Sequence, residues 1–300
     1  MTRLGIILVV ALALGIGCGG TLHAETESSH TQLDIAYGPH PLQRLDMHWP
    51  ADTVEDYPVV VFIHGGGLES GDKQDEDYGS VYKPFVQAGF AFATINYRLL
   101  SDSAWPAQAR DCAAAINWVR QAMTKQDGAA HPIFLMGHSS GAMLAALFGA
   151  DDEYLSAYGM KSTDLAGVIP MGSIMWDEDF ETAAARIPPD SLEVLFRRSS
   201  DRDFGSVEAY RRHWPMGHIN ASMPPYLFLV AEGEKENPPV LKHAIAFCDS
   251  ARTLGVTATW AVLNQRTHTS AIRRIAEPGD PAFAAIQDFI QKSLTAPTRK

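Results

Sequence analysis

Strand-like and helix-like segments alternate along most of this chain. Segments that are apolar at nearly every position are typical of strands buried on both faces, and they occur at residues 59–63, 90–97, 133–136, 165–171, 226–230 and 258–263. Helix-like segments are expected between and after these strands, at about residues 106–123, 142–148, 239–254 and 281–294. Strands that alternate with helices predict an α/β fold with a mostly parallel central sheet covered by helices on both faces.

One stretch, from about residue 172 to residue 222, interrupts this alternation. It is rich in charge and carries large aromatic side chains, namely Trp176, Phe180, Phe196, Phe204, Tyr210 and Trp214. We interpret it as an insertion that caps a site, with aromatic side chains that form either its own small core or contacts to a substrate. Because 46% of the residues are hydrophobic and no Gly/Pro/Ser-rich linker is present, we expect one domain over residues 25–300.

Residues 1–24 have the pattern of a secretory signal peptide. Arg3 precedes a short apolar run at residues 4–16, which is too short to span a membrane. Ala24 is the expected cleavage point, since it is small and polar sequence follows it. Cys18 offers an alternative, a lipoprotein with a lipid anchor on that cysteine, although Gly15 stands where a leucine is expected. The expected location is therefore secreted or periplasmic, without a membrane span.

Charge and cysteine content disfavour several classes of partner. Without residues 1–24 the chain keeps 23 basic and 35 acidic residues, a net charge of −12, which makes nucleic acid and anionic membrane surfaces poor partners. No histidine or cysteine spacing predicts a metal site, and no glycine-rich loop predicts a nucleotide cofactor. Cys112 and Cys248 fall on helix-like segments that such a sheet places far apart, so we expect two buried thiols rather than a disulfide.

The motif Gly137-His138-Ser139-Ser140-Gly141 lies between an expected strand and an expected helix. A chain that turns at once from strand into helix forces the central residue into a strained conformation, and glycine on either side lets the two backbones pass. Such a nucleophile elbow exposes the serine hydroxyl. The motif therefore makes Ser139 the candidate nucleophile of an acyl-transfer enzyme.

A second motif, His64-Gly65-Gly66-Gly67, directly follows the first apolar strand. Acyl transfer passes through a tetrahedral intermediate whose negative oxygen needs preorganised N–H donors. The amides of Gly65 and Gly66, together with that of Ser140, are expected to form this oxyanion hole. We interpret His64 as a brace for the loop rather than as a base.

A serine nucleophile needs an imidazole that takes its proton and a carboxylate that holds the imidazole. In folds built around this elbow the chain order is serine, acid, histidine, which leaves the four histidines after Ser139, namely His213, His218, His243 and His268. His243 lies in a helix-like run, and His213 and His218 come too early in the chain. His268 follows the last apolar strand, where the catalytic histidine of such folds belongs, and is the predicted base.

The acid is expected just after the strand at 226–230, where three glutamates compete: Glu232, Glu234 and Glu236. The usual spacing has a glycine at the end of the strand and the acid three residues later. With Gly233 as that glycine, the spacing selects Glu236. Glu234 is the second candidate, and Glu232 is expected to belong to the strand. Each of them also fits a solvated loop charge.

With these residues the chain resembles the α/β-hydrolase superfamily, in particular serine carboxylesterases near the hormone-sensitive-lipase-like and kynurenine-formamidase-like groups. The resemblance covers about residues 32–294 and includes Leu45-Asp46-Met47 with Trp49-Pro50, Gly71-Asp72-Lys73, Asn96-Tyr97-Arg98-Leu99, Trp105-Pro106 and Asp111. The chain departs from both groups. Hormone-sensitive-lipase-like enzymes usually have aspartate and alanine beside the serine, where this chain has His138 and Ser140, and kynurenine formamidases carry aromatic residues where it has Gly67-Leu68.

The resemblance implies an α/β-hydrolase fold and a serine carboxylesterase that acts through an acyl-enzyme on Ser139. The signal-peptide pattern adds the expectation that it is exported, and the charged insertion adds the expectation that it hydrolyses short-chain or aryl esters. His268 would deprotonate Ser139 and then protonate the leaving alcohol, and Glu236 would hold the imidazole. The implied partner is a small ester, and no cofactor is implied. Two alternatives stay open, an amidase or formamidase that uses the same residues, and an inactive hydrolase fold that serves as a binding module.

Overall fold

An eight-stranded sheet forms the centre of the protein, with the strand order β1-β2-β4-β3-β5-β6-β7-β8. The computed structural model describes residues 30–51, 57–196, 203–234 and 239–296, so the expected signal peptide and Cys18 lie outside the described residues. The strands are β1 Thr31–Ala36, β2 Arg44–His48, β3 Val59–Ile63, β4 Ala91–Ile95, β5 Ile133–His138, β6 Leu165–Met171, β7 Tyr226–Ala231 and β8 Ala258–Leu263.

The sheet is mostly parallel. β2 runs antiparallel to both β1 and β4, and all other neighbouring pairs are parallel. The register of β3 and β5 sets Ile63 beside Gly137, so the glycine-rich loop after β3 begins next to the turn after β5. Because the carboxyl ends of parallel strands meet at one edge of a sheet, the segments that follow β3, β5, β6, β7 and β8 gather there.

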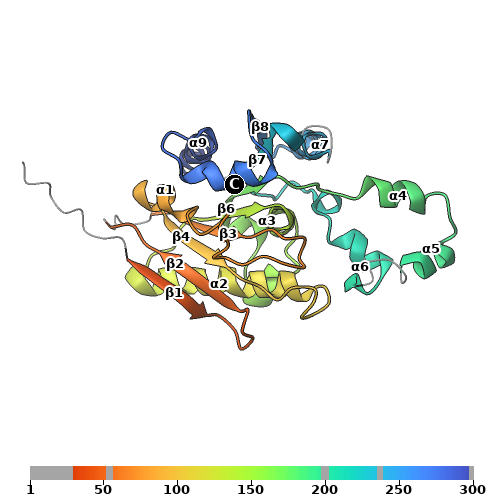
Figure 1. Ribbon diagram of the computed structural model, residues 1–300, viewed down its shortest axis with the longest axis horizontal. Coiled ribbons are helices and arrows are strands. Elements are labelled where there is room, and N and C mark those ends of the chain that lie inside the picture. Colours follow the sequence, from red (N-terminus) through yellow and green to blue (C-terminus); the bar gives the residue numbers. More distant parts are fainter. Residues whose placement is uncertain (1–29, 52–56, 197–202, 235–238, 297–300) are drawn as a thin grey trace, which may run out of the picture.

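Helices cover both faces of the sheet. One face packs against α1 Tyr82–Gln87, α8 His268–Arg273 and α9 Pro281–Thr295, and the other against α2 Ala107–Asp127, α3 Ser140–Ala150 and α7 Val240–Thr253. In Figure 1, α1 lies above β2, β3 and β4, and α2 lies below them. Along β3, Val60 and Phe62 belong to the core under α1 and α9, and Val59, Val61 and Ile63 to the core under α2 and α3. Successive strand side chains point to opposite faces, which explains why this strand is apolar at every position.

The structure confirms the expected α/β architecture. The predicted strands agree with β3, β6 and β8 in their bounds, whereas β4 is shorter than the apolar run at 90–97 and α2 continues to Asp127. The sequence pattern missed β1, where five of the six residues are exposed, because a strand at the sheet edge carries no continuous apolar run. It also missed the short helices α1 and α8. Cys112 and Cys248 are buried and free, as expected.

The described residues of the insertion between β6 and β7 form three α-helices, α4 Glu178–Ala184, α5 Pro189–Phe196 and α6 Val207–Arg212, and a 3-10 helix at Pro215–His218. The three α-helices project sideways from the body of the protein (Figure 1). The ring of Phe204 lies 5.2 Å from that of Tyr210, 4.3 Å from that of His213 and 5.4 Å from that of Trp105, measured between centroids. Aromatic side chains of the insertion therefore form a small core of their own, which Trp105 joins to the rest of the protein.

Within the described ranges, no helix combines the length and the apolar content needed to cross a membrane. The same part of the chain holds no group of three or more His, Cys, Asp or Glu side chains arranged to bind a metal ion.

Candidate active site

The chain turns from β5 into α3 at Ser139. This residue has φ 55° and ψ −127°, a backbone conformation that costs on the order of 1–3 kcal/mol for a residue other than glycine. The backbones at the turn are in close contact, since a Cβ at Gly137 would lie 2.1 Å from the carbonyl oxygen of Gly141, and a Cβ at Gly141 would lie 2.2 Å from that of Ile63. The geometry is that of a nucleophile elbow, in which both glycines are required and the serine is held in a strained conformation.

The loop after β3 lies against this elbow, where the Leu68 amide donates a hydrogen bond to Ser140 Oγ at 3.3 Å. Gly66 is exposed, whereas Gly65 is buried and its amide donates to the hydroxyl oxygen of Tyr78 at 3.2 Å. One of the three expected oxyanion donors, the Gly65 amide, therefore already has a partner. The amides of Gly66 and Ser140 have no partner among the described residues and stay the candidates for this role.

His64 braces the same loop from inside the protein. Its Nδ1 lies 2.7 Å from the carbonyl oxygen of Gly65, and its ring stacks on Tyr97 with centroids 4.4 Å apart. The Tyr97 hydroxyl donates to the His64 carbonyl oxygen at 3.0 Å. Because burial lowers the pKa of His64, the ring is neutral and packed, as a bracing role requires.

His268 is the first residue of α8 rather than part of a loop. The preceding residue, Thr267, caps the helix by a reciprocal pair of hydrogen bonds: the Ser270 amide donates to Thr267 Oγ1 at 3.3 Å, and the Thr267 amide donates to Ser270 Oγ at 2.8 Å. Such a capping box fixes the first turn of the helix. The His268 side chain, which is 43% exposed, is thereby carried on a rigid turn at the carboxyl edge of the sheet.

The carboxylate that contacts His268 belongs to Glu234. Glu234 Oε1 accepts a hydrogen bond from His268 Nδ1, and Glu234 Oε2 accepts one from the Ala231 amide at 3.0 Å. The Glu234 side chain is only 4% exposed, so these contacts take the place of water around its charge. The expected acid, Glu236, lies outside the described residues, and the position expected for it at the imidazole is occupied by Glu234, the second candidate.

The backbone explains why the acid comes earlier than the spacing from Gly233 predicted. β7 ends at Ala231, and a single 3-10 turn, Glu232–Glu234, follows at once. The Gln265 amide donates to Glu232 Oε2 at 2.8 Å, and the Gly233 amide donates to the Arg266 carbonyl oxygen at 3.1 Å. These bonds fasten the turn after β7 to the segment before α8, and they bring the third residue of the turn opposite His268.

A cavity of about 510 Å³ lies at this edge of the sheet, and we call it the Ser139 cavity. Its lining consists of Ser139, Gly172, Ser173, Ile174, Gly233, Glu234, Val240, Thr267 and His268. A Cβ at Gly172 would lie 3.1 Å from both Glu234 Oε1 and His268 Nδ1, so the absence of a side chain there leaves room for this pair. Among the described residues of the insertion, Gly172, Ser173 and Ile174 take part in the lining, and none from α4, α5 or α6 does.

The other histidine candidates lie away from this cavity. His213 is buried in the aromatic core of the insertion, His218 pairs with Asp151 at 2.6 Å, and His243 stacks on Trp176 with centroids 3.7 Å apart. None of the three lines the Ser139 cavity. The tertiary structure thus brings only His268 of the four candidates to the nucleophile.

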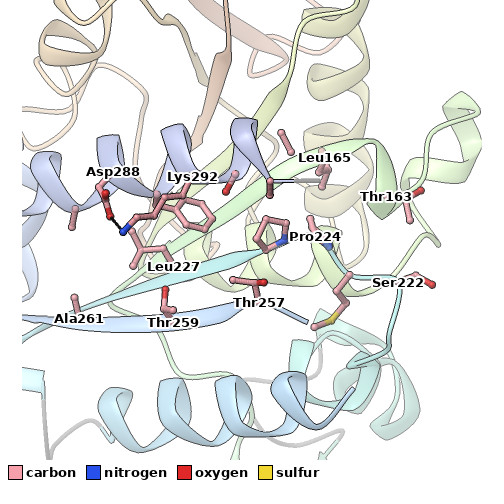
Figure 2. A pocket seen from close by; sticks show the side chains of 17 residues that line it. Thr163, Leu165, Ser222, Pro224, Leu227, Thr257, Thr259, Ala261, Asp288 and Lys292 are labelled. Carbon is pink, nitrogen blue, oxygen red and sulfur yellow. Dashed lines mark hydrogen bonds and ion pairs between the residues drawn. The ribbon is translucent and has the colours of Figure 1, made fainter. Parts of the chain in front are cut away.

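A larger cavity, of about 680 Å³, lies at the opposite end of the strands. Figure 2 shows its lining, which comes from β6, β7, β8 and α9, together with Thr163 and the segment at residues 222–225 that precedes β7. Its charged side chains, Lys292 and Asp288, pair with each other at 2.7 Å, and most of the remaining lining is apolar. Because ligands of such sheets bind at the carboxyl ends of the strands, and because the serine, imidazole and carboxylate all lie there, the chemistry belongs to the smaller cavity.

Comparison with known proteins agrees with this geometry. The sequence model of the BD-FAE family matches residues 45–245. The chain is 28% identical to Esterase LipQ of Mycobacterium tuberculosis over 271 residues, which cover 86% of this chain and 61% of LipQ. It is 21% identical to the kynurenine formamidase of Danio rerio, with 83% of this chain and 78% of that protein covered. The chain spans 51% to 62% of the lengths of four mycobacterial and plant relatives.

Among solved structures, a truncated carbohydrate esterase from gut microbiota superposes with a TM-score of 0.70 at 21% identity, covering 91% of this chain and 99% of that chain. At this level of identity the likeness establishes the α/β-hydrolase fold. The fold places Ser139, Glu234 and His268 at the carboxyl edge of the sheet, where they line one cavity.

Proposed function

Since the chain belongs to the BD-FAE family, we propose that it is a carboxylic ester hydrolase that forms an acyl-enzyme on Ser139. The observation that carries this proposal is the pairing of His268 with the buried carboxylate of Glu234, in the same cavity as the strained Ser139. A nucleophile, a base and an oriented acid are the three groups that acyl transfer through serine requires.

In the proposed reaction, His268 Nε2 takes the hydroxyl proton of Ser139 as Oγ attacks the ester carbonyl carbon. The amides of Gly66 and Ser140 donate hydrogen bonds to the oxyanion of the tetrahedral intermediate. His268 then gives the proton to the leaving alcohol, which leaves the acyl group on Ser139, and a water molecule activated by His268 completes the hydrolysis. Glu234 holds the Nδ1–H tautomer of His268 and stabilises its positive charge throughout.

A second candidate function is amide or formamide hydrolysis by the same residues. The similarity to a kynurenine formamidase favours keeping it as an alternative. The chemistry differs only in the leaving group, an amine in place of an alcohol, which His268 would protonate in the same way.

We further propose that the substrates are dissolved esters with short acyl groups. The large exposed apolar side chains of the described residues are Leu33, Tyr158, Val194, Leu254, Trp260 and Leu294, and none of them lines the Ser139 cavity. The insertion beside the cavity is charged, with Glu181 paired to Arg211 at 2.7 Å and Glu178 paired to Lys242 at 2.7 Å. A lipase needs a broad apolar face to adsorb to an oil surface, and these features oppose such adsorption.

Initial rates on p-nitrophenyl esters with two to sixteen acyl carbons test this proposal, and matched anilides measured in the same buffer test the amidase alternative. We expect the highest kcat/KM at two to four carbons, with anilides slower than esters. A maximum at the long end, or a jump in rate above the solubility limit of the ester, would contradict the esterase proposal in favour of a lipase. Faster turnover of the anilides would favour the amidase.

We also propose that the enzyme acts outside the cytoplasm, which rests on the signal-peptide pattern of residues 1–24. N-terminal sequencing of the protein recovered from the producing cells tests this step, and the expected first residue is Glu25. A mature chain that begins with a lipid-modified Cys18 would instead support the lipoprotein alternative.

A further inference from the structure

A tyrosine joins the oxyanion loop to the nucleophile elbow. Tyr78 follows this loop in the chain, and its hydroxyl oxygen lies 3.2 Å from the Gly65 amide and 3.0 Å from His138 Nδ1. Tyr78 is 7% exposed and His138 is 3% exposed, so these bonds are shielded from water. The residue before the nucleophile is therefore linked through one hydroxyl group to the first glycine of the loop.

The other nitrogen of His138 reaches the segment that carries the catalytic histidine. His138 Nε2 lies 3.1 Å from the carbonyl oxygen of His268, and the two imidazole rings pack with centroids 4.4 Å apart. His138 thus contacts both the backbone and the ring of His268. Three segments distant in sequence, at residues 65, 138 and 268, are connected by two side chains.

The direction of each of these hydrogen bonds follows from the neutral form of His138. The His268 carbonyl can only accept, so His138 Nε2 carries the hydrogen of the imidazole. Nδ1 of the same neutral ring is then an acceptor, so the Tyr78 hydroxyl donates its hydrogen to it, while the oxygen of that hydroxyl accepts from the Gly65 amide.

The surroundings of His138 favour this neutral form. Burial, together with the charge of His268, lowers the pKa of His138 to about 4, against smaller opposing effects of the hydrogen bond to the His268 carbonyl and of the Glu234 charge. The positive charge that His268 acquires when it takes the proton of Ser139 further disfavours a charge on His138. His138 is therefore neutral where it packs against the ring of His268.

We propose that Tyr78 and His138 are positioning residues, which hold the oxyanion loop and the catalytic histidine in one relative geometry through a single chain of hydrogen bonds. This inference rests on the proposed function of Ser139 and His268. The oxyanion donors and the base must be in place together in the transition state, and a misplacement of about 1 Å can cost about 10²-fold in rate. The hydrogen bonds through Tyr78 and His138 link the oxyanion loop to His268 directly within the protein, without a contact through the substrate.

Two substitutions break the central hydrogen bond from opposite sides. Tyr78→Phe keeps the ring and removes the hydroxyl, and His138→Gln keeps a donor for the His268 carbonyl while removing the acceptor for Tyr78. We expect each to lower kcat about tenfold with KM within about twofold, since positioning acts on the transition state. Because both remove one and the same link, the double variant should be no slower than the slower single variant.

The matched control is Tyr82→Phe, which removes a neighbouring phenol whose ring stacks on His48 with centroids 3.7 Å apart, outside this chain of hydrogen bonds. It should keep kcat within about twofold of the unmodified enzyme. Thermal unfolding of every variant separates positioning from lost stability. If His138→Gln does not fold, His138→Asn takes its place; it keeps the acceptor for Tyr78 and loses the donor for the His268 carbonyl. The loss of kcat in the double variant of His138→Asn with Tyr78→Phe should then be smaller than the product of the two single losses.

Labelling of Ser139 by a fluorophosphonate, measured as a rate for each variant, tells the two proposals apart. No labelling of the unmodified enzyme would contradict the proposed function itself. If the unmodified enzyme is labelled but Tyr78→Phe has an unchanged kcat, the positioning role alone is overturned. The same holds if the loss of kcat in the double variant equals the product of the two single losses. Slower labelling in both single variants, with no further slowing in the double variant, supports it.

Discussion

Ser139→Ala and His268→Ala are each expected to lower kcat/KM by about 10⁴-fold or more, because members of a triad act as a unit and the loss of one removes most of the catalysis. Neither change should unfold the protein. Ser139 is only partly buried, its replacement removes a single oxygen atom, and the His268 side chain is 43% exposed. The measurement is turnover of a short-chain ester, with circular dichroism and thermal unfolding of each variant as the check on folding.

Ser250→Ala, on α7, and His30→Ala, on the surface before β1, are the matched controls for these two changes, since neither residue lines the Ser139 cavity. Both should keep activity within about twofold of the unmodified enzyme. If His268→Ala kept more than about a tenth of the activity, the base would have to be another residue. Turnover in purified Ser139→Ala equal to that of the unmodified enzyme would contradict the acyl-enzyme on Ser139.

Glu234→Gln is expected to lower kcat by about 10²- to 10⁴-fold, because an amide neither fixes the required tautomer of His268 nor stabilises its cation. The change is nearly isosteric, so the bond between the side-chain oxygen and the Ala231 amide can persist and the fold is expected to stay intact. The same ester assay measures it.

The two neighbouring glutamates provide the comparison for this variant. Glu236→Gln should lower activity by less than about twofold if Glu236 is a solvated charge. Glu232→Gln should also have a small effect, because a glutamine oxygen can still accept the bond from the Gln265 amide. The reverse order, with a severe loss in Glu236→Gln and little change in Glu234→Gln, would return the acid to the residue that spacing selects.

Local patterns were sufficient for the elements that are buried or sterically demanding. The strand at 59–63 is apolar at every position because helices cover both of its faces, and burial of this kind is visible in any single sequence. The elbow was also predictable, because residues 137 and 141 have to be glycine. A Cβ at residue 137 would lie 2.1 Å from a neighbouring carbonyl oxygen, and a Cβ at residue 141 would lie 2.2 Å from another. The order of nucleophile and histidine along the chain then singled out His268.

The choice among the three glutamates depended on information that spacing does not contain. Glu232, Glu234 and Glu236 differ by one turn or less, and the end of β7 at Ala231 decides which of them can face the imidazole. The bonds from Gln265 and to Arg266 set that end, and they join segments more than thirty residues apart in the printed sequence. A rule based on the distance from a glycine cannot register such contacts.

The role of the Gly65 amide and the position of the insertion were likewise decided only in three dimensions. The sequence by itself determined the fold class and identified Ser139 and His268 as the candidate nucleophile and base, because strand burial and the strand-to-helix turn are local properties of a few neighbouring residues. The tertiary structure alone decided that Tyr78 takes the Gly65 amide, that His138 connects it to His268, and that Glu234 faces the imidazole. Each of these depends on hydrogen bonds between segments far apart in sequence, whose geometry is settled only when the whole sheet has formed.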